Sequence, residues 1–300
     1  MEFTNFMTII KEEVEKRAGK NCEVKLNTVM KNNGIVLNGI TVMKDDSNIS
    51  PTIYLNNFYE AYEKKEISLT EIVEKVMDVY EKNKIDKTID MKYFLDYEKV
   101  KNRIVYKLIN TDKNKELLKD VPHINYHDLS IVFQFLLAEE TLGSATILVH
   151  NAHLKIWNIS EKDLFDIACI NTPRLHKYEI NNIKDVIYEL MSMDGMMDCG
   201  LEQDTIIPMY VLSNKNRIHG AACMLYPDLI KDFSTAVNKN LFIIPSSIHE
   251  VLLLPVDDMA DSDHIKDMVK EVNSTQLEVE EILSDSLYYY DRSVNEIVVA

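Results

Sequence analysis

The sequence contains few of the residues that make a chain flexible. Among its 300 residues there are only 7 glycines and 7 prolines. Flexible or extended linkers between domains are usually rich in glycine, serine or proline. We therefore expect no long flexible linker, and we expect any two lobes of the chain to pack together.

Three glycine-dependent signatures of large enzyme classes are also absent. The sequence has no G-x-G-x-x-G, no G-x-x-x-x-G-K-[ST] and no G-x-S-x-G. The first two cradle phosphate groups on backbone amides, and the third exposes a serine nucleophile on a sharp turn. Their absence disfavours dinucleotide-dependent, P-loop and α/β-hydrolase chemistry, and we expect no cofactor.

Positive charge is scarce relative to negative charge. The chain has 33 lysines and arginines against 49 aspartates and glutamates, a formal net charge of -16. A field of this sign repels a phosphate backbone and an anionic membrane surface. The composition thus disfavours nucleic-acid binding and favours a soluble protein. A sharper alternative is an inhibitor that imitates a polyanion.

Paired cysteines and long apolar runs are missing as well. Cys22, Cys169, Cys199 and Cys223 are isolated, without a C-x-x-C pair. The first residues are acidic and lack the basic start of a signal peptide, and no apolar run is long enough to span a bilayer. We expect a cytoplasmic protein with four free thiols and no membrane segment.

Apolar residues at helical spacing predict several amphipathic helices. Gly19 is expected to end the first helix, the Ser68–Glu71 capping box to open the second, and Pro227 to lie in the first turn of the fourth. The expected helices lie at Phe3–Val14, from Ser68, from Ser160, at Pro227–Val237 and at Asp261–Asn273.

Runs of apolar and β-branched residues predict strands between these helices. Asn33-Gly34 is typical of a hairpin turn between the first two. The expected strands are Glu23–Val29, Ile35–Met43, Arg103–Ile109, Leu129–Leu137, Ala145–Val149, Ile207–Leu212, Leu241–Ile244, Val251–Leu254, Leu287–Tyr290 and Glu296–Val299.

Neighbouring strands with single helices between them, rather than strict alternation, favour an α+β fold with a mixed or antiparallel sheet and packed helices. The charged segment Glu81–Lys92 is the best candidate for a boundary between two lobes. We expect an N-terminal α/β lobe at residues 1–90 and a larger α+β lobe at residues 91–300.

One short segment brings together a titratable ring, a carboxylate and two hydroxyls. Its candidate binding residues are Ser246, Ser247, His249 and Glu250. They lie between the apolar runs Leu241–Ile244 and Val251–Leu254, a pattern typical of a buried strand, a polar turn and a second buried strand. The segment therefore places reactive groups where the core meets the surface.

The same segment does not have the form of a known catalytic motif. On an extended chain Ser247 and His249 would point to one side, and Glu250 to the other. A nucleophile and its base usually come from separate elements. The zinc motif H-E-x-x-H is not completed, because Leu253 stands at its last position. A structural turn, a binding site and a catalytic site remain as interpretations, in that order.

Other polar clusters give weaker indications of a metal site. His123 and His127 are four residues apart, but Pro122 and Asn125 favour a loop there over a helix face. His150 and His153 follow an expected strand, and Asp194 and Asp198 lie in the methionine-rich Met191–Gly200 segment. A zinc site needs three or four convergent ligands. None of these spacings supplies them, and we expect no metal.

Seven ordered blocks resemble one protein family along nearly the whole chain. They are Asn48–Leu55, Val100–Asn110, Leu117–His123, Asn171–Leu175, Gly220–Pro227, Ile244–Val251 and Leu283–Asp291. These blocks resemble the DUF5688 proteins, which occur in gut Firmicutes and their mobile elements. Two of the blocks, around Arg103–Ile109 and Asn171–Leu175, are more distantly similar to DUF1444. Neither resemblance implies a catalytic residue.

The absence of a catalytic signature and the acidic composition favour a non-enzymatic binding or regulatory protein. Its partner is expected to be a protein or a small molecule. The alternative is a hydrolase or transferase with a site assembled around His249 and Glu250.

Overall fold

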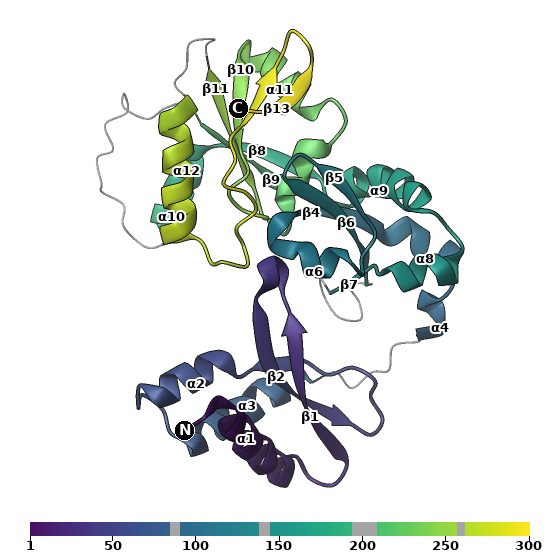
Figure 1. Ribbon diagram of the computed structural model, residues 1–300, viewed down its shortest axis with the longest axis vertical. Helices are drawn as coiled ribbons and strands as arrows, with labels where there is room; N and C mark the ends of the chain where they lie inside the picture. The colour runs from purple at the N-terminus through teal and green to yellow at the C-terminus, as the bar shows by residue number, and fades with distance from the viewer. Residues whose placement is uncertain (85–90, 138–144, 194–208, 257–261) are drawn as a thin grey trace. The chain divides into compact units, whose positions relative to one another are not determined.

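The computed structural model describes residues 1–84, 91–137, 145–193, 209–256 and 262–300, which form helices and antiparallel strands (Figure 1). The chain divides into two compact units, Met1–Phe94 and Leu95–Ala300. The described strands assemble into three sheets in which every pairing is antiparallel. The prediction of an α+β fold with antiparallel sheets is confirmed.

The first unit packs helices against a three-stranded sheet of order β1-β2-β3. Its elements are α1 (Phe3–Ala18), β1 (Cys22–Met30), η1 (Asn32–Gly34), β2 (Val36–Lys44), β3 (Thr52–Tyr54), α2 (Asn56–Glu63), α3 (Leu69–Asn83) and α4 (Met91–Phe94). The predicted hairpin between the first two strands is confirmed, with the one-turn helix η1 at its tip.

Local signals in the sequence determine where the helices of this unit begin and end. Gly19 follows α1 with a φ of 85°, a conformation that favours glycine. The Ser68 hydroxyl accepts the Glu71 amide at 3.3 Å, and the Glu71 carboxylate accepts the Ser68 amide at 2.9 Å. This capping box opens α3 as predicted. The apolar faces of α1 and α3 then share one core with the sheet.

The first half of the second unit is built on a four-stranded sheet in which β6 pairs with β4, β5 and β7. Its elements are α5 (Tyr97–Val100), η2 (Lys101–Arg103), β4 (Ile104–Asn110), η3 (Asp112–Asn114), α6 (Lys115–Leu118), β5 (His123–Tyr126), β6 (Leu129–Leu136), β7 (Thr146–Leu148), α8 (Asn151–Trp157) and α9 (Glu161–Leu175).

Helix α9 is attached to β4 by side chains that bond to the strand's backbone. The Tyr106 amide donates to the Thr172 hydroxyl at 3.0 Å, and the Asn171 amide group donates to the Ile104 carbonyl at 3.0 Å. Both donors and acceptors are buried, so each bond satisfies a group that water does not reach. These contacts fix the helix on the sheet.

The second half of this unit is a six-stranded sheet of order β13-β12-β10-β11-β9-β8. Its elements are β8 (Tyr178–Asn182), α10 (Ile183–Met193), β9 (Tyr210–Asn214), η4 (Gly220–Leu225), α11 (Leu229–Val237), β10 (Asn240–Ile244), β11 (Val251–Val256), α12 (Ser262–Gln276), β12 (Tyr288–Asp291) and β13 (Glu296–Val299). Val269 and Ile265 of α12 pack on Phe242 and Leu254 in this sheet. Figure 1 shows α12 beside the strands β10 and β11.

Two local expectations differ from the structure. Helix α11 begins at Leu229, because Asp228 before it has a left-handed φ of 56° and Pro227 therefore precedes the helix. Residues His123–Tyr126 form strand β5 rather than a loop. Pro122 lies just before the strand and Asn125 is exposed, so neither obstructs the pairing with β6.

Candidate functional site

The Ser246–Glu250 segment connects the predicted strands β10 and β11, which pair with each other in an antiparallel manner. A second segment, Glu281–Ser286, lies along it. The Ile248 amide donates to the Glu281 carbonyl at 2.9 Å, and the Leu283 amide donates to the Ser246 carbonyl at 2.8 Å. The candidate segment is therefore a loop at the end of the two central strands of the sheet, and it is hydrogen-bonded to a second loop.

The candidate hydroxyl and imidazole bond to backbone groups. The Ser247 hydroxyl accepts the His249 amide at 3.0 Å. The His249 ring accepts the His219 amide through Nδ1 at 3.3 Å. Because Nδ1 is the acceptor, the neutral ring carries its proton on Nε2. That nitrogen lies 3.7 Å from a carboxylate oxygen of Glu281.

The structure brings together Ser247 and His249 but does not join them as a catalytic pair. Among the described residues, no hydroxyl is hydrogen-bonded to a ring nitrogen of His249. The nearby carboxylate is that of Glu281 rather than Glu250. The side chains of Ser246 and Glu250 form no hydrogen bond or ion pair within the described chain. Sequence reasoning missed Glu281 and His219, which come from distant segments without a local signal.

A close backbone approach holds the same loop against η4. The Ser213 hydroxyl donates to the His249 carbonyl at 2.7 Å. A Cβ built on Gly220 would lie 2.1 Å from that hydroxyl oxygen and 2.4 Å from that carbonyl oxygen. Only glycine fits at this position.

His219 stacks on this loop and is hard to protonate. Its ring centre lies 5.9 Å from that of His249, with the planes 10° apart. Burial, together with the smaller effects of the nearby charges of Lys107, His249 and His176, lowers the pKa of His219 from 6.5 to about 3. Its Nδ1 is buried and has no hydrogen-bond partner among the residues that the structure describes. The ring is therefore neutral at any physiological pH.

This shift predicts acid sensitivity of the fold. Between pH 6.5 and pH 3 the unfolded chain binds a proton at His219 that the folded chain does not, so the free energy of unfolding falls as the pH drops. The slope from this residue is up to about 1.4 kcal/mol per pH unit. His219→Asn keeps a residue that tolerates the observed φ of 52° and removes the titrating ring.

We expect chemical unfolding between pH 7 and pH 4.5 to show a flatter pH dependence for His219→Asn than for wild type. The matched control is His264→Asn, at an exposed position of α12, which should retain the wild-type slope. Parallel curves for wild type and His219→Asn would contradict the prediction.

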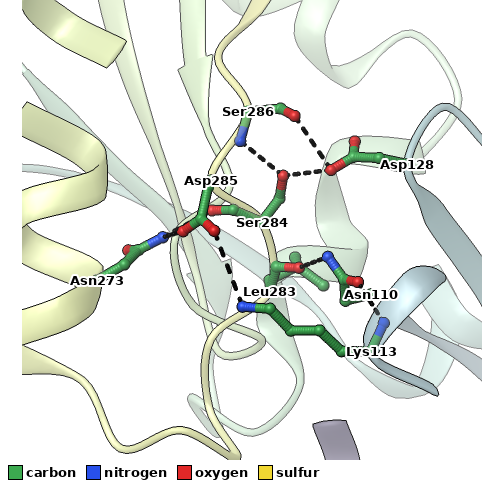
Figure 2. Close-up of polar contacts among 8 residues, drawn as sticks. All are labelled: Asn110, Lys113, Asp128, Asn273, Leu283, Ser284, Asp285 and Ser286. Atoms are coloured by element: carbon green, nitrogen blue, oxygen red, sulfur yellow. Dashed lines mark hydrogen bonds and ion pairs between the residues drawn. The ribbon is translucent and has the colours of Figure 1, made fainter. Parts of the chain in front are cut away.

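A second polar network ties the Glu281–Ser286 segment to the turn between β5 and β6. Figure 2 shows Asp128 in that turn facing Ser284 and Ser286. The Asp128 carboxylate accepts the Ser284 hydroxyl at 2.5 Å and the Ser286 hydroxyl at 3.2 Å. Its other oxygen accepts the Tyr288 hydroxyl. Burial raises the pKa of Tyr288, and Asp128 raises it further, so the phenol keeps the proton that it donates.

Buried amides extend this network on both sides (Figure 2). Asn110 donates to the Leu283 carbonyl at 3.0 Å. Asn273 of α12 donates to the Ser284 carbonyl and to the Asp285 carboxylate, each at 2.8 Å. The same segment is therefore fastened to β4 and to α12. The network joins the two halves of the second unit. The Ser284 hydroxyl that donates to Asp128 is fully buried, so the pair serves the packing of the unit.

An open groove of about 790 Å³ lies between α11 and the β12–β13 hairpin. Asn240 of β10 holds the hairpin through its side chain: its amide nitrogen donates to the Tyr289 hydroxyl at 2.7 Å, and its oxygen accepts the Arg292 amide at 3.1 Å. The Tyr290 hydroxyl donates to the Asn295 side chain at 2.6 Å. Lys231 and Thr235 line the groove from α11. Its walls are held by bonds between neighbouring elements.

His150 and His153 contact each other, and His150 also contacts Asp120. His150 precedes α8, where its amide donates to the His153 ring at 2.9 Å and its own ring lies 2.7 Å from the Asp120 carboxylate. The described residues contain no group of three or more His, Cys, Asp or Glu placed to hold a metal ion. Asp194 and Asp198 lie outside the described residues.

No described helix has the length and apolar character needed to cross a membrane.

Comparison with known proteins gives a family and no function. No curated protein and no solved structure matches the chain significantly. One family model, described as a family of unknown function, matches residues 3–292. The match covers nearly the whole sequence and both units, and the chain belongs to the DUF5688 family.

Proposed function

We propose that the protein is a non-enzymatic binding protein whose small-molecule ligand occupies the groove between α11 and the β12–β13 hairpin. The observation that carries the proposal is the groove itself. Its volume of about 790 Å³ falls in the range of small-molecule sites, roughly 300–1,000 Å³. Such sites combine a preformed shape with a few fixed polar groups, and this groove has both.

The chemistry of the lining supports binding over catalysis. Its hydroxyls come from Thr235, Tyr289, Tyr290 and Ser293, and none of the described residues that line it is a histidine. The Thr235 hydroxyl donates to the Lys231 carbonyl at 2.7 Å, which directs its proton into its own helix. Covalent catalysis usually requires a general base within hydrogen-bond reach of a nucleophile. The Ser293 hydroxyl does donate to the Asp291 carboxylate at 2.7 Å, but the Ser293 amide donates to the same oxygen, which makes this pair a local turn of the hairpin. The lining therefore suits recognition.

The Ser246–Glu250 segment has a supporting part in this proposal. The Ser247 hydroxyl and the His249 ring are hydrogen-bonded to backbone groups, which favours a structural role over an exposed binding site.

The proposal includes a cytoplasmic location, which the isolated cysteines favour; Cys22, Cys169 and Cys223 are free.

The groove can be blocked without disturbing its helix. Thr235 is exposed on α11, and a tryptophan there would fill the space that a ligand needs. We expect Thr235→Trp to abolish ligand-induced rises in melting temperature in a screen of small metabolites. Thr275→Trp is the matched control, because Thr275 is also an exposed helical threonine whose hydroxyl donates to the carbonyl four residues earlier, at 2.8 Å.

Native mass spectrometry of the wild-type protein with the same compounds provides an independent reading of the complex. The proposal fails if no compound binds wild type, or if Thr235→Trp and Thr275→Trp bind every ligand equally well.

A further inference from the structure

We propose that the groove recognises an anionic oxygen group, a phosphate or a carboxylate, held between Arg292 and Lys231. This inference rests on the proposed function and specifies the chemistry of its ligand. The groove would hold the charged end of a small molecule at the mouth between α11 and the hairpin turn.

The charges in the lining favour an anion despite the acidity of the chain. The lining contains two cations, Lys231 and Arg292, and one carboxylate, Asp291. The Asp291 carboxylate already accepts the Ser293 amide at 2.8 Å and the Ser293 hydroxyl at 2.7 Å. It is turned to its own hairpin. The residues that line the groove therefore include more cations than carboxylates, although the chain has a net charge of -16.

The two cations differ in how firmly they are already paired. Arg292 forms no ion pair with any residue that the structure describes. Lys231 has Asp228 at 3.5 Å, and both side chains are more than half exposed. Exposed pairs of this kind are weak, so a ligand anion can replace Asp228 at little cost. Asp232, on the same helix, is exposed and does not line the groove. Its charge reduces the positive potential that the two cations create.

Lys231 and Arg292 line the groove together with Tyr290. Burial raises the pKa of Tyr290; the charges of Lys231 and Arg292 oppose that rise, and those of Asp228 and Asp232 add to it. The Tyr290 hydroxyl donates to the Asn295 oxygen, so the Asn295 amide nitrogen keeps two N–H donors with no partner among the described residues. Arg292, Lys231 and Asn295 thus offer donors only. Guanidinium, ammonium and amide N–H groups together complement oxygen anions.

The test uses two probes that carry the two kinds of anion, pyrophosphate and citrate. Their affinities are measured by isothermal titration calorimetry at pH 7.5 and low salt on wild type, Arg292→Gln and Arg217→Gln. Arg217 is a matched control in the same unit, since it is exposed and has Glu179 at 3.5 Å. Both variants remove one positive charge, so a general field effect is equal in the two.

We expect Arg292→Gln to weaken binding about tenfold or more, the usual loss for a charged hydrogen bond, and Arg217→Gln to leave it within about twofold. Binding of pyrophosphate alone assigns a phosphate ligand, binding of citrate alone assigns a carboxylate, and binding of both supports the shared anion chemistry. Neither probe binding at millimolar concentration, or equal losses in both variants, would overturn the inference.

Failure of this inference is distinguishable from failure of the proposed function. A ligand that Thr235→Trp excludes and that Arg292→Gln binds with unchanged affinity would show a binding groove without anion recognition. If every ligand binds equally well to wild type and to Thr235→Trp, the groove is not the binding site, and the proposed anion site in it is rejected as well.

Discussion

Gly220→Ala is expected to destabilise the second unit by about 3 kcal/mol or more. The new Cβ would lie 2.1 Å from the Ser213 hydroxyl oxygen, 2.4 Å from the His249 carbonyl oxygen and 2.7 Å from the Asn214 amide nitrogen. Two of these three atoms belong to the backbone, which cannot rotate away as a side chain can. The strand β9 and the loop after β10 would have to separate. Equilibrium unfolding in urea measures the loss.

Two further variants identify the cause of this effect. Gly19→Ala introduces a Cβ with no atom within 4 Å, although at a φ of 85°, and should cost only about 1–2 kcal/mol. Ser213→Ala combined with Gly220→Ala removes the closest contact and leaves the two backbone contacts. We expect the double variant to remain strongly destabilised. If Gly220→Ala is as stable as Gly19→Ala, the close packing of this loop is wrong.

Elements with strong local patterns were predictable from the sequence. The strands β4 and β6 are buried along almost their whole length, so each appears as a continuous apolar run. The α3 and α9 capping boxes depend on residues three apart, which the sequence displays directly. In contrast, β8 has only half-exposed or exposed side chains and includes two asparagines. Its strand conformation comes from pairing with β9 rather than from its own residues.

The candidate site was predictable only in part, for the same physical reason. The strand–turn–strand form of the Ser246–Glu250 segment follows from the two apolar runs around it. The partners of His249 do not, because His219 and Glu281 reach it through long-range packing. The groove is formed by α11 and a hairpin that are separate in the sequence. In the sequence its lining residues cannot be told from other surface residues, because only the fold places them side by side.

The network around Asp128 carries the second large expected effect. The carboxylate accepts three hydroxyls, and two of their owners, Ser284 and Tyr288, are fully buried. Asp128→Ala would leave these two hydroxyls without their acceptor in a place that water does not reach. Each unsatisfied buried group costs about 1–3 kcal/mol. We therefore expect Asp128→Ala to lower the free energy of unfolding by about 3–5 kcal/mol.

A matched control and a double-mutant cycle separate this network from a general charge effect. Asp112→Ala also removes one carboxylate, but Asp112 is 81% exposed and pairs with Lys115 at 2.8 Å, so its loss should cost no more than about 1 kcal/mol. In a Tyr288→Phe background, Asp128→Ala should cost less than in wild type, because one of the stranded hydroxyls is already gone. Urea unfolding of the four proteins of the cycle gives the coupling energy. A coupling near zero, or equal losses for Asp128→Ala and Asp112→Ala, would show that the hydroxyls around Asp128 do not hold the two halves of the unit together.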